Sequence, residues 1–530
     1  MLTSFFKKNN KQHKGPSTDE LIERGFEPKN GRIDILFVFP PTSIAARYGK
    51  EDIGEEVVGG NSIPLGIASL AAYVREKGFG VGVLECPGLG IDADKVHEVI
   101  KEKDPGIIAF SSTTYRLLET KKIAERIRKD FPKKLIVLGG SHANVAGEET
   151  AEESNLFDVI PYGLDGEYII HDIVKQYSEK NFDRNSFMED FTMLKEIKGI
   201  IYKQNDKVIK NAVRETIKDL DELPFPARDL FPLERYIPLP NQYKRLPATN
   251  MLVIRGCPYV CTFCDQAGTG ARRRSPQKVI DEMKDCVEKF GVKEISFWDD
   301  TLSYHKKWMK EFLNLLIEAN LDISWSCYAA VNTVDKEILL LMKKAGCWNI
   351  FYGLETATPV LAKNILTDRK NRDFNRMKEV TTWTREAGIQ FRGSFMFGMP
   401  GETPELAKQT IQNAIDLDPD YAQFGVVCPF PGTQLAKEIK EGKWGKIIEN
   451  NLEVYNGWKV TWLPHGYNSP EELEDMERYA YKKFYLRPSY ILKRILKIRS
   501  LEDIKRYLKG GIALIKGGYL ARLRTNVIDR

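Results

Sequence analysis

The sequence has no long apolar run. No uninterrupted stretch is long enough to cross a bilayer as a helix, and the polar segment Met1–Arg32 lacks the apolar centre of a secretory signal peptide. Cysteine is scarce, because eight cysteines in 530 residues do not make a disulfide framework. A composition of 42% hydrophobic and 29% charged residues does not favour disorder. We therefore expect a cytoplasmic protein with two or more folded domains.

Three of the cysteines stand together, and no fourth lies nearby. Cys257, Cys261 and Cys264 have C-x3-C-x2-C spacing in a loop that follows the apolar run Asn250–Ile254, a predicted strand. Three thiolates hold three corners of a [4Fe–4S] cluster and leave one iron open for another ligand. The alternatives are a zinc site, which usually has four ligands and a second knuckle, or three unrelated thiols. The other cysteines are scattered and are expected to be buried free thiols: Cys86, Cys286, Cys327, Cys347 and Cys428.

The first half of the chain predicts a parallel sheet. Residues 1–31 are expected to form a mobile leader with a short helix. From residue 32 to 185, short apolar strands alternate with helices, which indicates a Rossmann-like, doubly wound α/β domain. Ligands of such sheets bind beyond the carboxyl ends of the strands. The candidate ligand-binding residues at those ends are small, polar or imidazole-bearing: Pro41, Ser111, Ser112, Gly139, Gly140, Ser141, His142 and Gly163. The absence of G-x-G-x-x-G argues against a dinucleotide.

The second half predicts a partial (β/α)6 barrel over residues 246–445, after a hairpin and proline-punctuated linker at 186–245. Six strands are expected, and catalytic groups of β/α barrels follow the strands. The residues that do so are Asp299, Asp300, Gly353, Glu355, Gly398 and Pro400. The paired aspartates could bind a metal, act as acid and base, or cap the next helix. Residues 446–530 are expected to be a helical region.

Taken together, these motifs resemble those of the radical S-adenosylmethionine (SAM) enzymes, whose cysteine signature carries an aromatic residue before the last cysteine, here Phe263. With the N-terminal domain, the resemblance is to the cobalamin-dependent (B12-binding) class, in its methyltransferase and anaerobic-cyclase branch. It implies a [4Fe–4S] cluster on the three cysteines. It implies SAM contacts from Phe263 and the barrel residues above, and cobalamin contacts from the strand-end residues of the first domain. Arg272–Ser275 resembles the basic element that follows the cluster, or is a solvated turn.

Two departures from the family pattern affect these expectations. No D-x-H-x-x-G motif follows Phe39, so a histidine ligand to cobalt is not expected, and His142 is expected near the cobalamin tail. The pair Ala329-Ala330 stands where family members often carry an arginine after the third strand.

The resemblance also implies a reaction. An external one-electron reductant such as flavodoxin or ferredoxin would reduce the cluster, and SAM would yield a 5′-deoxyadenosyl radical that attacks a small-molecule or lipid substrate. Methyl transfer from methylcobalamin is the main expectation, and ring closure or rearrangement is the alternative. A transfer-RNA methylthiotransferase would need three more N-terminal cysteines, where only Cys86 exists, and no nucleic-acid partner is expected. A non-enzymatic cobalamin sensor is the alternative from another class.

The positive charge is concentrated at the C-terminus. From Lys482 to Arg530 there are fourteen Lys/Arg against three Asp/Glu, although the whole chain carries only +5. The segment after Leu486 is both basic and apolar at helical spacing. Such a segment either lies on an anionic membrane surface or packs over the open side of the barrel with its lysines in water.

Overall fold

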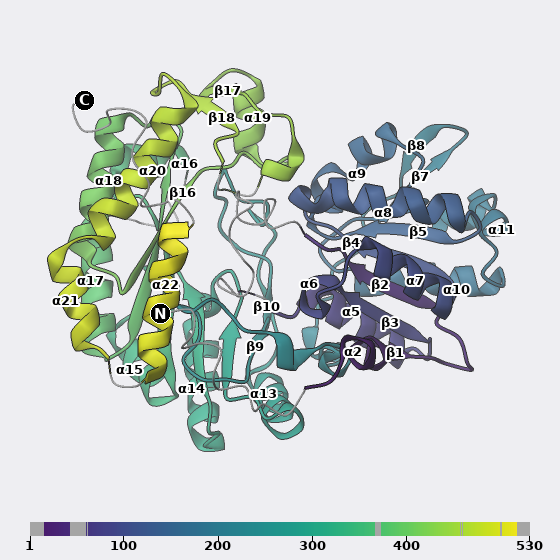
Figure 1. Cartoon of the computed structure of the whole chain (residues 1–530), viewed down its shortest axis with the longest axis horizontal. Coiled ribbons are helices and arrows are strands. Elements are labelled where there is room, and N and C mark those ends of the chain that lie inside the picture. Colours follow the sequence, from purple (N-terminus) through teal and green to yellow (C-terminus); the bar gives the residue numbers. More distant parts are fainter. Residues whose placement is uncertain are drawn as a thin grey trace, which may run out of the picture.

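The computed structural model describes residues 15–42, 60, 62–365, 373–455, 457, 459–498 and 501–516. It contains an eight-stranded sheet and a six-stranded sheet, which lie side by side (Figure 1). The chain completes the first sheet (purple and blue) before it enters the second (teal and green). The predicted α/β architecture of a Rossmann-like domain followed by a partial barrel is confirmed.

The N-terminal sheet has the strand order β1-β3-β2-β4-β5-β6-β7-β8, and its central strands are parallel. Its strands are β1 Phe26–Glu27, β2 Ile35–Phe39, β3 Val81–Glu85, β4 Ile107–Ser111, β5 Leu135–Gly139, β6 Val159–Pro161, β7 Ile200–Gln204 and β8 Lys207–Lys210. Its helices are α2 Thr18–Arg24, α5 Leu65–Glu76, α6 Cys86–Leu89, α7 Ala93–Lys103, α8 Leu117–Asp130, α9 Ser141–Glu153, α10 Glu167–Glu179, α11 Arg184–Met188 and α12 Phe191–Glu196.

Alternating side chains of the central strands build a core on each face of this sheet. Ile35 and Phe37 of β2 pack with α5 and α10 on one face, and Leu36 and Val38 pack with α7 and α8 on the other. Burial on both faces is the reason why these strands are continuous apolar runs rather than alternating ones.

Two expectations for this half need correction. Residues 26–27 of the supposed leader form an edge strand, because β1 pairs antiparallel with β3 and places Phe26 opposite Gly82; residues 1–14 lie outside the described part of the chain. The hairpin β7–β8, which we assigned to the linker, extends the N-terminal sheet through antiparallel pairing with β6.

The second sheet is parallel and open, with the order β16-β15-β14-β13-β12-β9. Its strands are β9 Ala248–Met251, β12 Glu294–Phe297, β13 Ser324–Ala329, β14 Cys347–Glu355, β15 Gln390–Phe397 and β16 Tyr421–Val426. Its helices are α13 Pro276–Phe290, α14 Lys306–Ala319, α15 Lys336–Lys344, α16 Pro359–Ile365, α17 Phe374–Glu386, α18 Pro404–Leu417 and α19 Gln434–Lys440. The predicted strand Asn250–Ile254 is split: β9 ends at Met251, and β10 Ile254–Arg255 pairs instead with β11 Arg272–Arg273.

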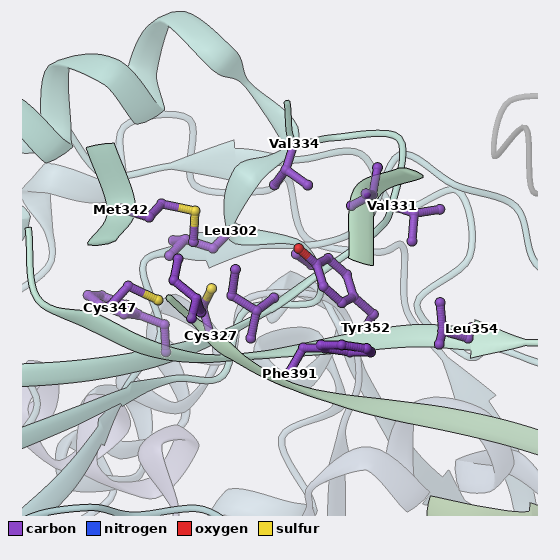
Figure 2. Close-up of a cluster of buried hydrophobic side chains, with 14 of the residues drawn as sticks. Leu302, Cys327, Val331, Val334, Met342, Cys347, Tyr352, Leu354 and Phe391 are labelled. Atoms are coloured by element: carbon purple, nitrogen blue, oxygen red, sulfur yellow. The ribbon is translucent and has the colours of Figure 1, made fainter. Parts of the chain in front are cut away.

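A continuous apolar core lies between this sheet and its helices. Figure 2 shows part of it, where Tyr352 and Phe391 of neighbouring strands lie near Val334 and Leu354. Cys327 and Cys347 are members of this core (Figure 2). All five cysteines outside the loop are buried free thiols, as predicted.

The region after residue 445 is not helical throughout. It begins with a small antiparallel pair, β17 Gly445–Ile447 and β18 Trp462–Pro464. Three helices follow: α20 Pro470–Tyr485, α21 Pro488–Leu496 and α22 Leu501–Lys516. Helix α20 packs Tyr481 and Phe484 against Phe424 of the edge strand β16. In the described residues no helix is both long and apolar enough to span a membrane.

Candidate functional site

The cysteine loop lies between β10 and β11 and is held by its own backbone. Gly256 opens it at a φ of +82°, and a Cβ there would lie 2.1 Å from the carbonyl oxygen of Gly270, so a side chain has no room. The Cys257 amide donates to Thr269 Oγ1 (3.0 Å), and the Gly268 amide donates to the Tyr259 carbonyl (2.7 Å). The loop is therefore a fixed turn.

The barrel side also anchors this loop. The Thr262 amide donates to the carbonyl of Ile365 at the end of α16 (3.0 Å), and the Leu435 amide of α19 donates to the Thr262 carbonyl (2.8 Å). Two short helices, α16 and α19, thus support the loop. Phe263 is half-buried in the same apolar cluster as Met399 and Leu361.

The three cysteines are set in this apolar cluster as free thiols. Cys257 and Cys261 are buried and Cys264 is half-buried. Burial raises the pKa of Cys264 to about 12, so the thiol is protonated at neutral pH without a metal. Because a metal binds the thiolate, metal binding would release this proton. Ligands of a cuboidal cluster bind three different irons and need not meet at one point. Within the described ranges, no three His, Cys, Asp or Glu side chains gather to hold a single metal ion. Donor type, number and apolar setting fit a [4Fe–4S] cluster.

The two adjacent aspartates after β12 have different positions. Asp299 is fully buried, and its Oδ1 accepts hydrogen bonds from the amides of Val253 and Ile254. Burial raises the pKa of Asp299 to about 7. This carboxyl ends β9 and turns the chain into the cysteine loop, so a direct SAM contact predicted for Asp299 does not fit its position. Asp300 instead faces the cavity described below.

Gly353 and Glu355 lie at the end of β14, where the register against β15 shifts. Glu355 adopts a φ of +44°, which is unusual for a residue with a side chain. A Cβ at Gly353 would lie 2.6 Å from Glu355 Oε1. A side chain at residue 353 would therefore displace the Glu355 carboxylate from its position over the strand end.

The loop after β15 carries the predicted residues Gly398 and Pro400. The buried Glu402 side chain fixes this loop. Its Oε1 accepts hydrogen bonds from the Gly398 amide (2.6 Å) and from the Tyr467 hydroxyl (2.6 Å). The carbonyl of Pro400 accepts from Asn364 Nδ2 (2.8 Å). Burial raises the pKa of Glu402 to about 7.

We expect Glu402→Gln to change the pH dependence of stability. The folded pKa lies above the unfolded value of 4.5, so the unfolded chain loses this proton first as pH rises. The stability that the proton contributes is full below pH 4.5 and is lost as pH rises towards 7. Glutamine cannot ionise, so the free energy of unfolding of the variant should gain up to about 3 kcal/mol relative to wild type across this window. Urea unfolding at several pH values measures it.

The exposed neighbour Glu405 provides the matched control. Glu405→Gln on α18 should leave the wild-type slope between pH 4.5 and 7 close to unchanged, because a hydrogen bond with Thr403 lowers the pKa of this exposed carboxyl and keeps it ionised in the folded protein across the window. An unchanged slope in Glu402→Gln would show that Glu402 is ionised in the folded protein.

A cavity of about 560 Å³ lies between the two sheets. The carboxyl ends of β4, β5 and β6 line it from one side, and the residues around the cysteine loop line it from the other. The predicted cobalamin-binding residues on its wall are Ser111, Gly139, Gly140, Ser141 and Gly163. Gly140 has a φ of +95°, and a Cβ there would lie 2.4 Å from the Ser112 carbonyl oxygen. The adjacent glycines Gly139 and Gly140 therefore leave this part of the wall as backbone without side chains.

Three predicted cobalamin-binding residues do not line this cavity. His142 is buried between Thr114 Oγ1 (3.3 Å) and Thr150 Oγ1 (3.0 Å), and burial lowers its pKa to about 4. It is a neutral core residue outside the lining, so a contact with a ligand in this cavity does not fit its position. The Ser112 side chain is buried against Thr120 (3.1 Å), and Pro41 lies outside the lining.

An ionic cluster joins the two domains beside the cavity. Arg255, next to the cysteine loop, donates to Asp165 (3.0 Å) and to both oxygens of Glu167 (2.9 and 2.5 Å). Arg272 also pairs with Asp165. Burial works to raise the pKa of Asp165, but the hydrogen bonds from Arg272 and Arg255 hold it below its ordinary value.

These bonds correct the interpretation of the basic segment as a solvated turn. Arg274 is buried against Glu282 (3.0 Å). The sequence placed Gly163 and Arg272–Ser275 near the predicted ligands, but the pairing of Arg272 with Asp165 was not predicted. The available signal was charge complementarity between an acidic strand end and arginines that flank the cysteines.

A Rossmann-like sheet that faces a six-stranded half-barrel, with a three-cysteine loop at the shared cavity, defines a radical SAM enzyme with an added ligand domain. The family model of the Radical SAM superfamily matches residues 251–414, and the family model of the B12 binding domain matches residues 53–168. It is 32% identical over 492 residues to an uncharacterized methyltransferase of Pyrococcus horikoshii, covering 90% of this chain and 97% of the relative.

Another relative and a solved structure are similar to this chain over most of its length. The anaerobic magnesium-protoporphyrin IX monomethyl ester cyclase of Rubrivivax gelatinosus is 27% identical over 476 residues, covering 88% of this chain and 81% of that one. The methyltransferase TsrM of Kitasatospora setae, solved with cobalamin and a [4Fe–4S] cluster, has a TM-score of 0.66 at 16% identity and covers 91% and 99%. The chain belongs to the cobalamin-dependent radical SAM enzymes of the methyltransferase and anaerobic-cyclase branch. Its cofactors are a [4Fe–4S] cluster, SAM and cobalamin. Such an enzyme needs a small-molecule substrate and an electron donor.

Proposed function

We propose that this protein methylates an unactivated carbon atom of a small-molecule or lipid substrate, with cobalamin as the methyl carrier. The observation that carries the proposal is the shared cavity, whose walls are the bare strand ends of the first domain and the surroundings of the cysteine loop. A ligand on each wall would face the other across one space. The names of the relatives, which include methyltransferases, favour methylation over ring closure.

The chain's own residues would position these groups. Cys257, Cys261 and Cys264 would hold the cluster, with Asp299 and Gly256 fixing the entry of their loop. Phe263, Asp300, Gly353, Glu355, Gly398 and Pro400 would form the SAM pocket. Ser111, Gly139, Gly140, Ser141 and Gly163 would support the cobalamin.

When bound, the cofactors supply an electron, a 5′-deoxyadenosyl radical and a transferable methyl group. The protein keeps this chemistry away from water with the apolar cluster around the cysteines, formed by residues such as Met399 and Val427. We infer that a flavodoxin or ferredoxin supplies the electrons. Eight free cysteines suit a reducing cytoplasm.

The test uses reconstituted enzyme, a strong reductant and SAM whose methyl group carries three deuteriums, incubated with small-molecule and lipid extracts. We expect a new product that carries the deuterated methyl group, together with 5′-deoxyadenosine, both read by mass spectrometry. Gly139→Val should lose bound cobalamin and this product but retain iron, because a Cβ there meets only the Phe110 carbonyl oxygen at 3.7 Å and the added side chain would take space at the cavity wall. Gly510→Val on α22 is the control, since open space surrounds it and it lies outside the cavity lining.

Two outcomes would contradict the proposal. A new SAM-dependent product without deuterium would indicate ring closure or rearrangement. Cobalamin binding without any cleavage of SAM would indicate a sensor.

A further inference from the structure

The helix α21 presents its apolar side to solvent. Its Tyr490 is buried and donates to the Asp420 carbonyl (2.9 Å), and Arg494 and Lys497 pair with the Asp420 carboxylate (2.8 and 2.6 Å). The charged side of the helix therefore faces the protein. The opposite side is exposed: Ile491, Leu492, Ile495 and Leu496, of which Leu496 is 63% exposed. A helix that only packed over the barrel would be oriented the other way.

The next helix exposes a second set of apolar side chains. On α22, the apolar residues Ile504, Leu508, Ile512 and Ile515 recur at intervals of four, four and three positions, so they share one face. All four are exposed, and Ile515 reaches 66%. On the other side, Leu514 packs against the core of the half-barrel, which fixes the orientation of the helix. Figure 1 shows α21 and α22 (yellow) on the outside of the molecule. We call these eight residues the apolar stripe.

Positive charge predominates around the stripe. Residues 482–530 hold fourteen Lys/Arg and three Asp/Glu. Four of these cations pair with Asp418 or Asp420 of the protein itself: Arg487, Lys493, Arg494 and Lys497. On α22, lysines follow the stripe residues at positions 505, 509 and 516. A protein partner with an apolar patch would not require this excess of cations, whereas an anionic bilayer offers both an apolar interior and negative head groups.

We propose that the apolar stripe and its cations bind the surface of an anionic lipid bilayer, with α21 and α22 in the interface plane. Monomeric proteins rarely expose contiguous apolar patches without a use for them. The α20 helix and the inner side of α21 pack against the barrel, so the alternative of simple packing holds for them but not for the stripe. This inference does not depend on methyl transfer.

The test is sedimentation of the full-length protein with vesicles of phosphatidylglycerol and phosphatidylcholine. Wild type should bind phosphatidylglycerol vesicles, bind phosphatidylcholine alone weakly, and bind less in high salt. The double variant Leu492→Gln with Leu508→Gln should bind about tenfold or more weakly, since two apolar side chains no longer enter the bilayer. The control pair is Leu340→Gln with Val360→Gln, which are 52% and 60% exposed on α15 and α16; it should bind like wild type.

Surface substitutions are preferred to a deletion because a deletion would also remove Tyr490 and Arg494, which bind Asp420. Circular dichroism should show the same unfolding midpoint for all proteins. Equal binding by wild type and the stripe variant would overturn the proposal. So would a wild-type dimer, seen by analytical ultracentrifugation, that the stripe variant dissociates without any vesicle binding: the occupant would then be a second copy.

Discussion

Cys261→Ser is expected to reduce iron content and 5′-deoxyadenosine formation to background. The loop offers three thiols to three irons, and hydroxyl oxygen is a much poorer ligand for iron–sulfur clusters than thiolate. The loop's own hydrogen bonds do not involve this side chain, so the fold should persist. Iron analysis, visible absorbance and mass spectrometry after reduction with SAM measure the result.

The control is a buried cysteine outside the loop. Cys286→Ala on α13 should keep its iron and its activity, because Cys286 belongs to the core of the half-barrel. A cluster that survives in both Cys257→Ser and Cys261→Ser would contradict the assignment.

Arg255→Met is expected to lower the free energy of unfolding by about 3–5 kcal/mol, because it leaves the buried carboxylate of Glu167 without its partner. Both oxygens of Glu167 accept from Arg255, and the Glu167 side chain is only 3% exposed. The ion pairs hold the Arg255 pKa above its ordinary value although burial works to lower it. Urea unfolding measures the loss.

Two further variants make this prediction specific. Arg245→Met removes an exposed pair with Asp322, which is 70% exposed, and should cost less than about 1 kcal/mol. Combining Arg255→Met with Glu167→Met should recover most of the loss, because no carboxylate then stays buried alone. Equal costs for Arg255→Met and Arg245→Met would show that the interdomain cluster is not a buried ion pair.

The strands and helices of both sheets were predictable where a local pattern defines them. The apolar run Val81–Glu85 forms the strand β3, and Pro404, a residue that favours the first turn of a helix, begins α18. The cysteine loop was predictable because the C-x3-C-x2-C spacing alone brings three cluster ligands into one short loop.

The rest depends on contacts that are distant in sequence. Nothing near Asp299 shows that its carboxylate accepts from amides 45 and 46 residues earlier. The burial of His142 results from threonines on other elements. The pairing of Arg272 with Asp165 spans 107 residues, and β7–β8 join the first sheet only because β6 is available as an edge.

The central claim is that an iron–sulfur cluster, SAM and cobalamin all bind around one cavity. The most direct measurement is made on the anaerobically reconstituted full-length protein: iron and cobalamin content, then 5′-deoxyadenosine after addition of SAM and a strong reductant. We predict four irons and one cobalamin per chain, with 5′-deoxyadenosine formed. Protein that binds no iron, or binds iron and cobalamin but leaves SAM intact, would contradict the claim.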